Sequence, residues 1–218
     1  MIKAVIFDLD GVLIDSEPLH ALADNQLLIE SGIFAPGNYF DRFVGLSNWD
    51  MWTEIKREYT IALSIEELME LQMPMKLKLL REMDFEPVRG VTGLLEDLRK
   101  REVPMAIASS SPRQFIENVI QKIGISEYFT VWISGEEVEH SKPEPDIFLK
   151  AAELLNAKPH ACAVIEDSTS GTVAAKRAGM KCIGYKNPNS GNQDLSQADY
   201  IIEEIKSAEI LSVLFGEA

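Results

Sequence analysis

The chain has 218 residues, of which 46% are hydrophobic, and a formal net charge of −14. This length allows one large domain or a domain with a sizeable insert, and the hydrophobic fraction is ordinary for a globular protein. The excess of acidic residues argues against a broad basic face for nucleic acid. No apolar stretch approaches the ~18 residues that would span a bilayer.

The cysteines and the first residues point to an intracellular protein. Cys162 and Cys182 each lie in an apolar run, which is typical of small buried side chains rather than of a disulfide. Met1-Ile2-Lys3 leads into an apolar run without the pattern of a signal peptide. We therefore expect a cytoplasmic monomer with a small-molecule substrate and with no nucleic-acid or membrane partner.

Short apolar runs along the chain predict the strands of a buried sheet. They occupy residues 3–7, 104–108, 130–133, 161–165, 181–185 and 200–202. The runs are continuous rather than alternating, as expected for a parallel sheet covered on both faces. Helical patterns lie between them, at residues 93–101, 115–123, 145–155 and 168–178. Strands that alternate with helices predict an α/β fold with a Rossmann-like, doubly wound parallel sheet core.

The segment from about residue 16 to residue 86 breaks this alternation. It contains helix-like patterns and no convincing strand, with helices expected over residues 19–29, 51–59, 65–73 and 75–83. Pro74 separates the last two patterns. So long a detour predicts an inserted helical cap domain at residues 16–86, with residues 1–15 and 87–218 forming the α/β core. The connections at 14–17 and 86–90 are the expected hinges.

Polar side chains follow four of the predicted strands. Asp8 and Asp10 follow the first, Ser109-Ser110-Ser111 follows the second, Lys142 lies in the loop after the third, and Glu166-Asp167 follows the fourth. Because ligands of open α/β sheets bind at the carboxyl ends of the strands, we expect these groups to meet at one edge. Carboxylates are costly to bury unless they are paired, protonated or bound to a metal.

These residues resemble the motifs of a known family. Asp8-Leu9-Asp10-Gly11, Ser109, Lys142 and Glu166-Asp167 are similar to the four motifs of the haloacid dehalogenase superfamily, and the helical insert resembles its cap class. The strings DLDGVLIDSEP, SKPEPDIF and IEDSTSG resemble the β-phosphoglucomutase-like branch. The likeness covers essentially the whole chain.

The resemblance implies phosphoryl transfer assisted by Mg²⁺. Asp8 would be the nucleophile that forms an aspartyl-phosphate, and Asp10 would protonate the leaving oxygen and then activate water. Asp8, the backbone carbonyl of Asp10 and Asp167 would bind Mg²⁺, with Glu166 as a direct or an outer ligand. Hydrolytic dehalogenases of the superfamily lack the second Asp, so Asp10 points to a phosphate rather than a carbon–halogen bond.

The phosphate would be bound by Ser109, by the amide of Ser110 and by the ammonium of Lys142. Seen alone, a run of serines is usually a turn or a helix cap, and a lone lysine is usually solvated. The motifs occur after predicted strands, which is the context that supports the functional interpretation.

The cap is expected to choose the leaving group. His20 falls where the mutase of this branch has a hinge histidine, and residues 44–50 resemble its substrate-specificity loop. The mutase has an arginine in that loop to bind a second phosphate, whereas the nearest residue here is Asn48, and an amide does not replace a bidentate arginine. The mutase also has a cap lysine that aligns with an apolar stretch here, although Lys76 and Lys78 are near.

Two further residues are candidates for contacts with the leaving group. Trp49 could stack on a sugar ring, or pack within the cap. Arg113 could bind a second anionic group, or lie on a helix surface. The favoured function is a phosphatase of a small phosphorylated metabolite, a sugar or polyol phosphate. The alternative is a β-phosphoglucomutase that interconverts β-glucose 1-phosphate and glucose 6-phosphate.

Two other classes fit less well. A signalling receiver also uses an acceptor Asp, Lys and Mg²⁺, but its acceptor lies on a later strand and it has no cap. A non-catalytic scaffold would be expected to have lost motif residues, and all four motifs are filled here.

Overall fold

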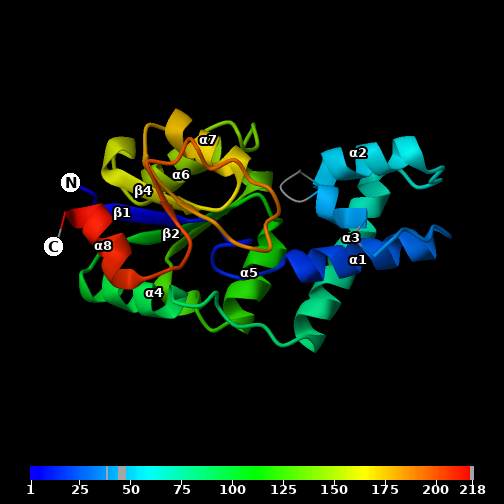
Figure 1. Cartoon of the computed structure of the whole chain (residues 1–218), viewed down its shortest axis with the longest axis horizontal. Helices are drawn as coiled ribbons and strands as arrows, with labels where there is room; N and C mark the ends of the chain where they lie inside the picture. Colours follow the sequence, from blue (N-terminus) through cyan, green and yellow to red (C-terminus); the bar gives the residue numbers. More distant parts are fainter. Residues whose placement is uncertain (38, 44–47, 217–218) are drawn as a thin grey trace.

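The computed structural model describes residues 1–37, 39–43 and 48–216. At its centre is a six-stranded parallel sheet with the strand order β3-β2-β1-β4-β5-β6 (Figure 1). The strands are β1 (Ala4–Phe7), β2 (Met105–Ser109), β3 (Val131–Ser134), β4 (Cys162–Glu166), β5 (Lys181–Tyr185) and β6 (Tyr200–Ile202). All six lie within one residue of the predicted bounds.

Helices cover both faces of this sheet. One face is covered by α4 (Val91–Lys100), α5 (Arg113–Lys122) and α8 (Ser207–Phe215), and the other by α6 (Asp146–Leu154) and α7 (Thr169–Arg177) (Figure 1). Alternate residues of β1 separate the two apolar layers, because Val5 and Phe7 pack in the first and Ala4 and Ile6 in the second. The predicted doubly wound fold is confirmed, although the sequence prediction missed α8.

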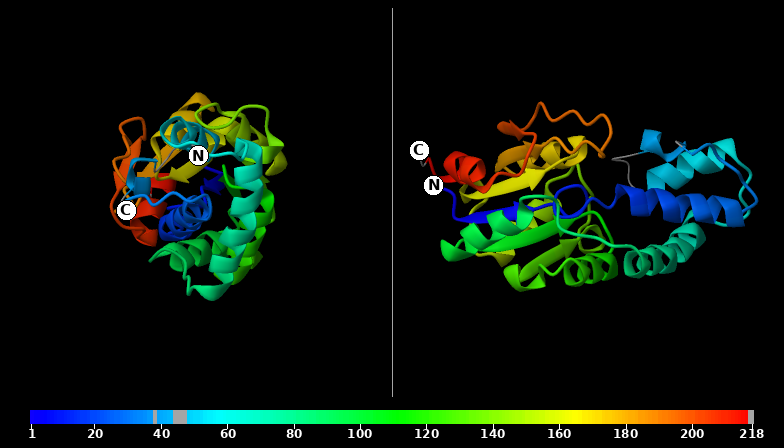
Figure 2. Two further views of the ribbon diagram at one scale, coloured as in Figure 1. Left: turned by 90° about the vertical axis from the view of Figure 1, so that its right-hand side faces the viewer. Right: turned by 60° about the horizontal axis from the view of Figure 1, so that its bottom comes forward.

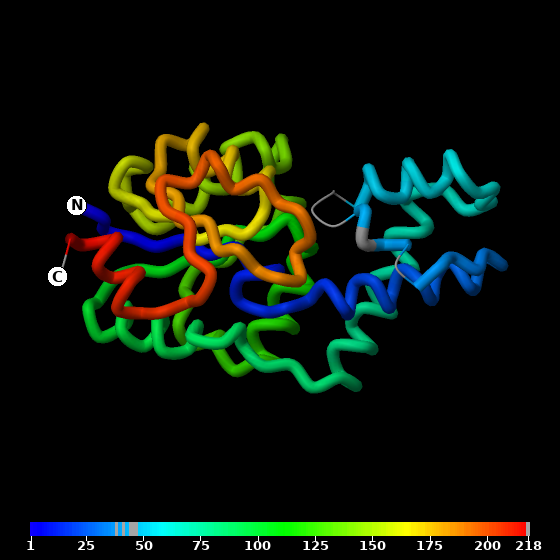
Figure 3. The backbone as a smooth tube through the Cα atoms, in the orientation of Figure 1, coloured from blue at the N-terminus to red at the C-terminus, as the bar shows by residue number. Residues whose placement is uncertain are grey.

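Three longer helices lie beyond the carboxyl ends of the strands. They are α1 (Glu17–Glu30), α2 (Asn48–Glu58) and α3 (Ile65–Glu82), and two further views place them together at one end of the sheet (Figure 2). The N-terminus and α8 lie at the opposite end (Figure 3). Short 3₁₀ helices complete the fold: η1 (Tyr39–Phe43), η2 (Ser126–Tyr128), η3 (Gly135–Glu137) and η4 (Pro159–Ala161).

The helical insert has an apolar cluster of its own. Trp52 is fully buried at its centre, between side chains from α1, α2, α3 and η1. The other buried members are Leu27, Leu28, Tyr39, Phe40, Phe43, Met51, Ile55, Ile61 and Leu68. A second contact joins the insert to the α/β core. Leu19, Leu77 and Leu80 of the insert belong to the same apolar cluster as Phe115 of α5.

Helix α3 corrects one prediction. We expected Pro74 to separate two helices, but a single helix runs through it from Ile65 to Glu82. The proline is exposed, while Leu68 and Leu77 on either side are buried. A proline inside a helix costs about 3 kcal/mol. Leu68 before Pro74 packs in the insert's own cluster, and Leu77 and Leu80 after it pack in the cluster of the core, and this packing on both sides offsets the cost.

The two connections to the insert run side by side. Ile14 forms a bridge with Pro87, and the amide of Val88 donates to the carbonyl oxygen of Leu13 at 3.0 Å. These positions coincide with the expected hinges, and we infer from them that the core and the cap divide near residues 15 and 86. Among the described residues, no helix combines the length and apolar character that a membrane-spanning segment requires.

The cap cluster predicts a clear difference between two tryptophans of α2. Trp52→Ala should lower the free energy of unfolding by about 3–5 kcal/mol, because it removes the largest buried side chain of the cluster. Trp49→Ala is the matched control, since that side chain is 47% exposed and its loss should change stability by about 0.5 kcal/mol or less. Urea denaturation followed by circular dichroism measures both. Equal losses in the two variants would contradict a separate cap core.

Candidate functional site

The predicted site residues converge at the centre of the sheet edge. β1 lies between β2 and β4, where the strand order reverses, and this is where open α/β sheets bind ligands. Asp8 follows β1, Glu166 ends β4 and Asp167 follows it. These three residues are 1–6% exposed, and one carboxylate oxygen from each lies within 4.8 Å of the others.

Lys142 joins this cluster from the loop before α6. Its Nζ donates to Asp8 Oδ1 at 2.6 Å and to Glu166 Oε1 at 2.7 Å, and also to the carbonyl oxygen of Ala108 at 3.1 Å. The Lys142 side chain is itself buried. With every group ionised, the carboxylates of Asp8, Glu166 and Asp167 and this one ammonium sum to −2. Buried charge of this kind requires compensation.

Burial and the crowding of carboxylates also raise the pKa values of Asp8 and Asp167. Burial raises the pKa of Asp8 to about 8, with Lys142 opposing the shift and Glu166 reinforcing it. Burial, followed by repulsion from Glu166 and Asp8, places the pKa of Asp167 well above its ordinary value. A divalent cation would relieve this repulsion, and clustered carboxylate oxygens are the donors that Mg²⁺ prefers. The residues present therefore fit a divalent metal ion.

Asp10 lies beside this cluster in a different environment. Its Oδ1 accepts a hydrogen bond from Ser16 Oγ at 2.5 Å and contacts His20 Nε2 at 3.0 Å. Its Oδ2 accepts from Ser111 Oγ at 2.6 Å and from Ser109 Oγ at 3.3 Å. Burial raises the pKa of Asp10, but the bonds from His20, Ser111 and Ser16 outweigh it and keep the pKa below the usual range. Asp10 is thus an ionised acceptor here.

Sequence reasoning missed two of these partners. Ser16 is the N-cap residue of α1, but its hydroxyl bonds to Asp10 and not to the helix backbone. Ser111 has no predicted role of its own beyond its place in the serine run after β2. Ser109 is buried and its hydroxyl accepts from the Ser111 amide at 3.0 Å, whereas Ser110 is exposed.

Two glycines allow the acidic groups to approach the backbone. Gly11 has a φ of +80°, and a Cβ there would overlap the Asp167 carboxylate. A Cβ at Gly171, in the first turn of α7, would overlap Glu166. The same turn binds the second carboxylate oxygen of Glu166, which accepts from the Ser168 amide at 2.7 Å and from its hydroxyl at 2.9 Å. Neither glycine can be replaced without displacing an acid of the cluster.

The candidate leaving-group residues do not all reach the site. His20 does, through its contact with Asp10. Asn48 and Trp49 begin α2, and residues 44–47 of the predicted specificity loop lie outside the described residues. Arg113 forms ion pairs with Glu117 at 3.1 Å and Glu137 at 2.9 Å at the start of α5, which does not favour binding of a second substrate anion.

Of the two cap lysines that the sequence analysis named, only Lys76 is buried. Lys76 of α3 is 4% exposed, whereas Lys78 lies on the surface. Burial lowers the pKa of Lys76, and the carboxylates of Asp24, Asp10 and Glu17 oppose this effect. Asp24 in turn accepts a hydrogen bond from Gln72 Nε2. The cap therefore contributes a buried lysine whose amino group interacts electrostatically with Asp24, Asp10 and Glu17.

Known proteins resemble the chain along its whole length. A model of the haloacid dehalogenase-like hydrolase family matches residues 5–185. The phosphorylated carbohydrates phosphatase of Thermotoga maritima is 30% identical over 213 residues, which cover 97% of this chain and 98% of the relative. Hexitol phosphatase B of Escherichia coli K12 is 30% identical over 195 residues, covering 88% and 86%. The structure of β-phosphoglucomutase from Clostridium difficile has a TM-score of 0.83 at 27% identity, covering 99% and 98%.

The glycine contacts yield a matched pair of variants. Gly171→Ala should lower turnover by about 10-fold or more, because its methyl group displaces Glu166 from Lys142 and Ser168. Gly93 occupies the same third position in α4 and has no atom within 4 Å of an added Cβ. Gly93→Ala should therefore retain turnover and stabilise the protein by about 0.5–1 kcal/mol. Phosphate release and thermal unfolding measure both, and full activity of Gly171→Ala would refute the contact.

Proposed function

We propose that this chain, which belongs to the haloacid dehalogenase-like hydrolase family, is a Mg²⁺-dependent phosphatase of small sugar or polyol phosphates that works through an aspartyl-phosphate. The observation that carries the proposal is the buried cluster of Asp8, Glu166 and Asp167 with Lys142 at the central strand ends. The names of the relatives from T. maritima and E. coli support a carbohydrate or hexitol as the leaving group.

Asp8 is the proposed nucleophile. It follows the central strand, where its carboxylate is fixed by Lys142. One Asp8 oxygen would attack phosphorus in line with the departing oxygen, and water would then hydrolyse the acyl phosphate. Lys142 would bind a phosphate oxygen as well as orienting Asp8. When bound, Mg²⁺ would supply positive charge between the carboxylates and the phosphate.

Asp10 and His20 are the proposed acid–base pair. The ionised Asp10 carboxylate is suited to accept a proton from the attacking water in the second step. In the first step a proton from His20 Nε2 would pass across the 3.0 Å contact to Asp10 and on to the leaving oxygen, and the proton taken from water in the second step would restore it. Ser16 and Ser111 orient the carboxylate for both steps.

The helical insert would act as the cap that selects the leaving group. α1 carries His20, which contacts Asp10, and Glu17 beside it, and α3 carries the buried Lys76. Closure of such a cap would exclude water while the substrate is bound. The paired backbone connections at Ile14 and Pro87 are the segments about which it would move.

Mutase activity is the second candidate because of one observation. The buried Lys76, whose pKa is affected by Asp10, would serve as the cap lysine of a mutase. Against this, Asn48 stands near the position of the mutase arginine, and Arg113 is engaged by two glutamates. A bisphosphate intermediate would require more local positive charge than these residues provide.

A substrate panel separates the two candidates. Sugar, polyol and nucleotide monophosphates are each incubated with the protein and Mg²⁺, and released phosphate is measured beside isomerisation of β-glucose 1-phosphate. We expect phosphate release to be fastest with a sugar or polyol phosphate. Isomerisation that outpaces hydrolysis would establish the mutase instead, and a preference for nucleotides would exclude the proposed substrate class.

The nucleophile has its own test. Asp8→Asn should lower turnover by about 10³-fold or more while the protein remains folded, since the amide keeps the shape of the side chain but cannot attack phosphorus. Asp84→Asn, at an exposed position after α3, is the control and should turn over normally. Circular dichroism checks the fold of both. Wild-type phosphate release by purified Asp8→Asn would remove the assignment.

A further inference from the structure

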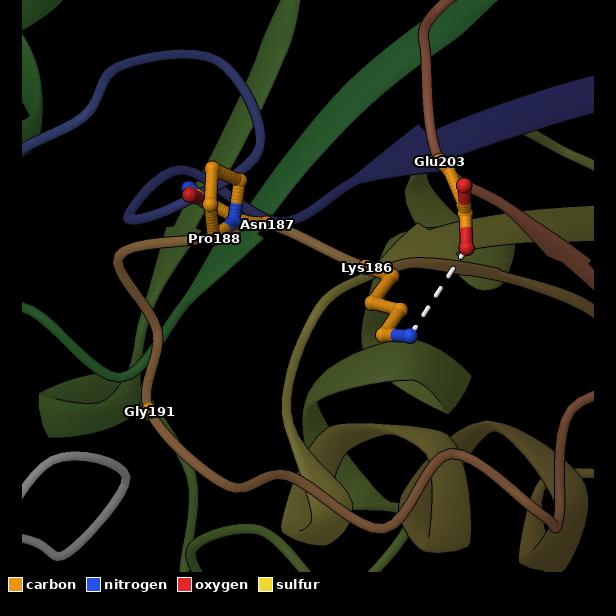
Figure 4. A pocket seen from close by; sticks show the side chains of 5 residues that line it. All are labelled: Lys186, Asn187, Pro188, Gly191 and Glu203. Atoms are coloured by element: carbon orange, nitrogen blue, oxygen red, sulfur yellow. Dashed lines mark ion pairs between the residues drawn. The ribbon is translucent and has the colours of Figure 1, made fainter.

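The loop that follows β5 contacts two of the segments that build the acidic cluster. Its residues Asn187 and Ser190 are only 7% and 4% exposed, although they were not among the predicted site residues. Figure 4 shows Asn187, Pro188 and Gly191 of this loop beside an open pocket, whose rim also contains the ion pair of Lys186 and Glu203 at 3.7 Å. The buried side chains of Asn187 and Ser190 make contacts with the loop after β1 and with the residue after β4.

Asn187 ties this loop to the loop after β1. Its Nδ2 donates to the carbonyl oxygen of Gly11 at 2.8 Å, and its Oδ1 accepts from the Asn189 amide at 2.8 Å. Asn189 Nδ2 donates in turn to Asp15 Oδ2 at 2.5 Å. Both ends of the buried Asn187 amide are therefore satisfied, and they fix the loop against the segment that carries Asp10.

Ser190 makes the contact to the acidic cluster. Its hydroxyl donates to Asp167 Oδ2. The Gly11 backbone packs against the same pair, since an added Cβ would lie 2.9 Å from Ser190 Oγ and would overlap Asp167. Gln193 links the Ser190 backbone to the start of α7. Its Nε2 donates to the Ser190 carbonyl oxygen at 3.0 Å, and its Oε1 accepts from the Thr169 amide at 2.9 Å.

We propose that Ser190, held in place by Asn187, is a positioning residue that orients the Asp167 carboxylate for a divalent cation. The hydroxyl binds Oδ2 and so leaves Oδ1 available to the cation shared with Asp8 and Glu166. The inference rests on the cation site of the proposed function.

Asp167 needs a fixed hydrogen-bond donor because the carboxylates of the acidic cluster repel one another. One oxygen from each of Asp8, Glu166 and Asp167 lies within 4.8 Å of the others, so like charges would favour a turn of Asp167 away from the site when no metal is bound. A hydrogen bond from a buried serine keeps the carboxylate in place before the cation arrives. Partners of this kind typically contribute 10–100-fold to metal affinity.

The test measures metal binding directly. Mn²⁺ alone is titrated into metal-free protein by calorimetry, and the Mg²⁺ concentration for half-maximal phosphate release is measured separately. Ser190→Ala should weaken Mn²⁺ binding about 10-fold and raise the half-saturating Mg²⁺ by a similar factor. The kcat at saturating Mg²⁺ should fall by less than the affinity, a split that general damage to the fold would not produce.

Two further variants complete the design. Asn187→Ala should weaken Mn²⁺ binding in the same direction, and its effect should not add to that of Ser190→Ala because both act through one loop. Ser196→Ala, at an exposed position farther along the loop, is the control and should bind Mn²⁺ as the wild type does.

Each outcome separates this inference from the proposed function. Unchanged Mn²⁺ affinity in Ser190→Ala, or an equal loss in Ser196→Ala, would overturn the positioning role while leaving the phosphatase intact. A wild-type protein that binds no Mn²⁺ would overturn the cation site and this role with it. Weakened Mn²⁺ binding by Ser190→Ala, in a protein that hydrolyses no phosphate ester, would support the role and refute the phosphatase.

Discussion

The structure depends on three carboxylates gathered in a buried site with only one lysine to oppose them. Asp8, Glu166 and Asp167 repel one another, and Lys142 compensates part of their charge. Much of the surrounding backbone is shaped by this constraint. Glycines stand where any side chain would displace an acid, and the first turn of α7 donates its amide and hydroxyl groups to Glu166. A divalent cation that neutralised these carboxylates would also supply the positive charge that the proposed reaction of a phosphate ester needs.

The fold brings these groups together from positions up to about 160 residues apart. Asp8 and Glu166 lie at the ends of neighbouring parallel strands, and the reversal of strand order beside β1 leaves their carboxyl ends open for a ligand. The chain leaves the core only eight residues after Asp8, at Ser16, whose hydroxyl bonds to Asp10. Ser16 and His20 of the helical insert thereby contact the Asp10 carboxylate directly, so a movement of the insert would change its orientation.

The parts of the molecule that follow from local patterns were predictable. Continuous apolar runs gave the strands to within one residue, and the motif residues of the family located Lys142 although a single lysine has no distinguishing local signal. The prediction at Pro74 was wrong because local propensity does not register the packing of Leu68 and Leu77 on either side of it. Arg113 could have been assigned to the surface from Glu117, four residues later on the same helix. Ser190 could not be found in this way, because its bond to Asp167 joins two turns that look ordinary by themselves.

Removal and return of the metal ion is the measurement that tests the central claim most directly. The protein is treated with EDTA and passed into metal-free buffer, and phosphate release from its best substrate is followed before and after Mg²⁺ is added. The account predicts that turnover stops without the cation and returns when Mg²⁺ is restored, because the acidic cluster cannot otherwise receive a negatively charged phosphate. Undiminished turnover in the metal-free protein would contradict it.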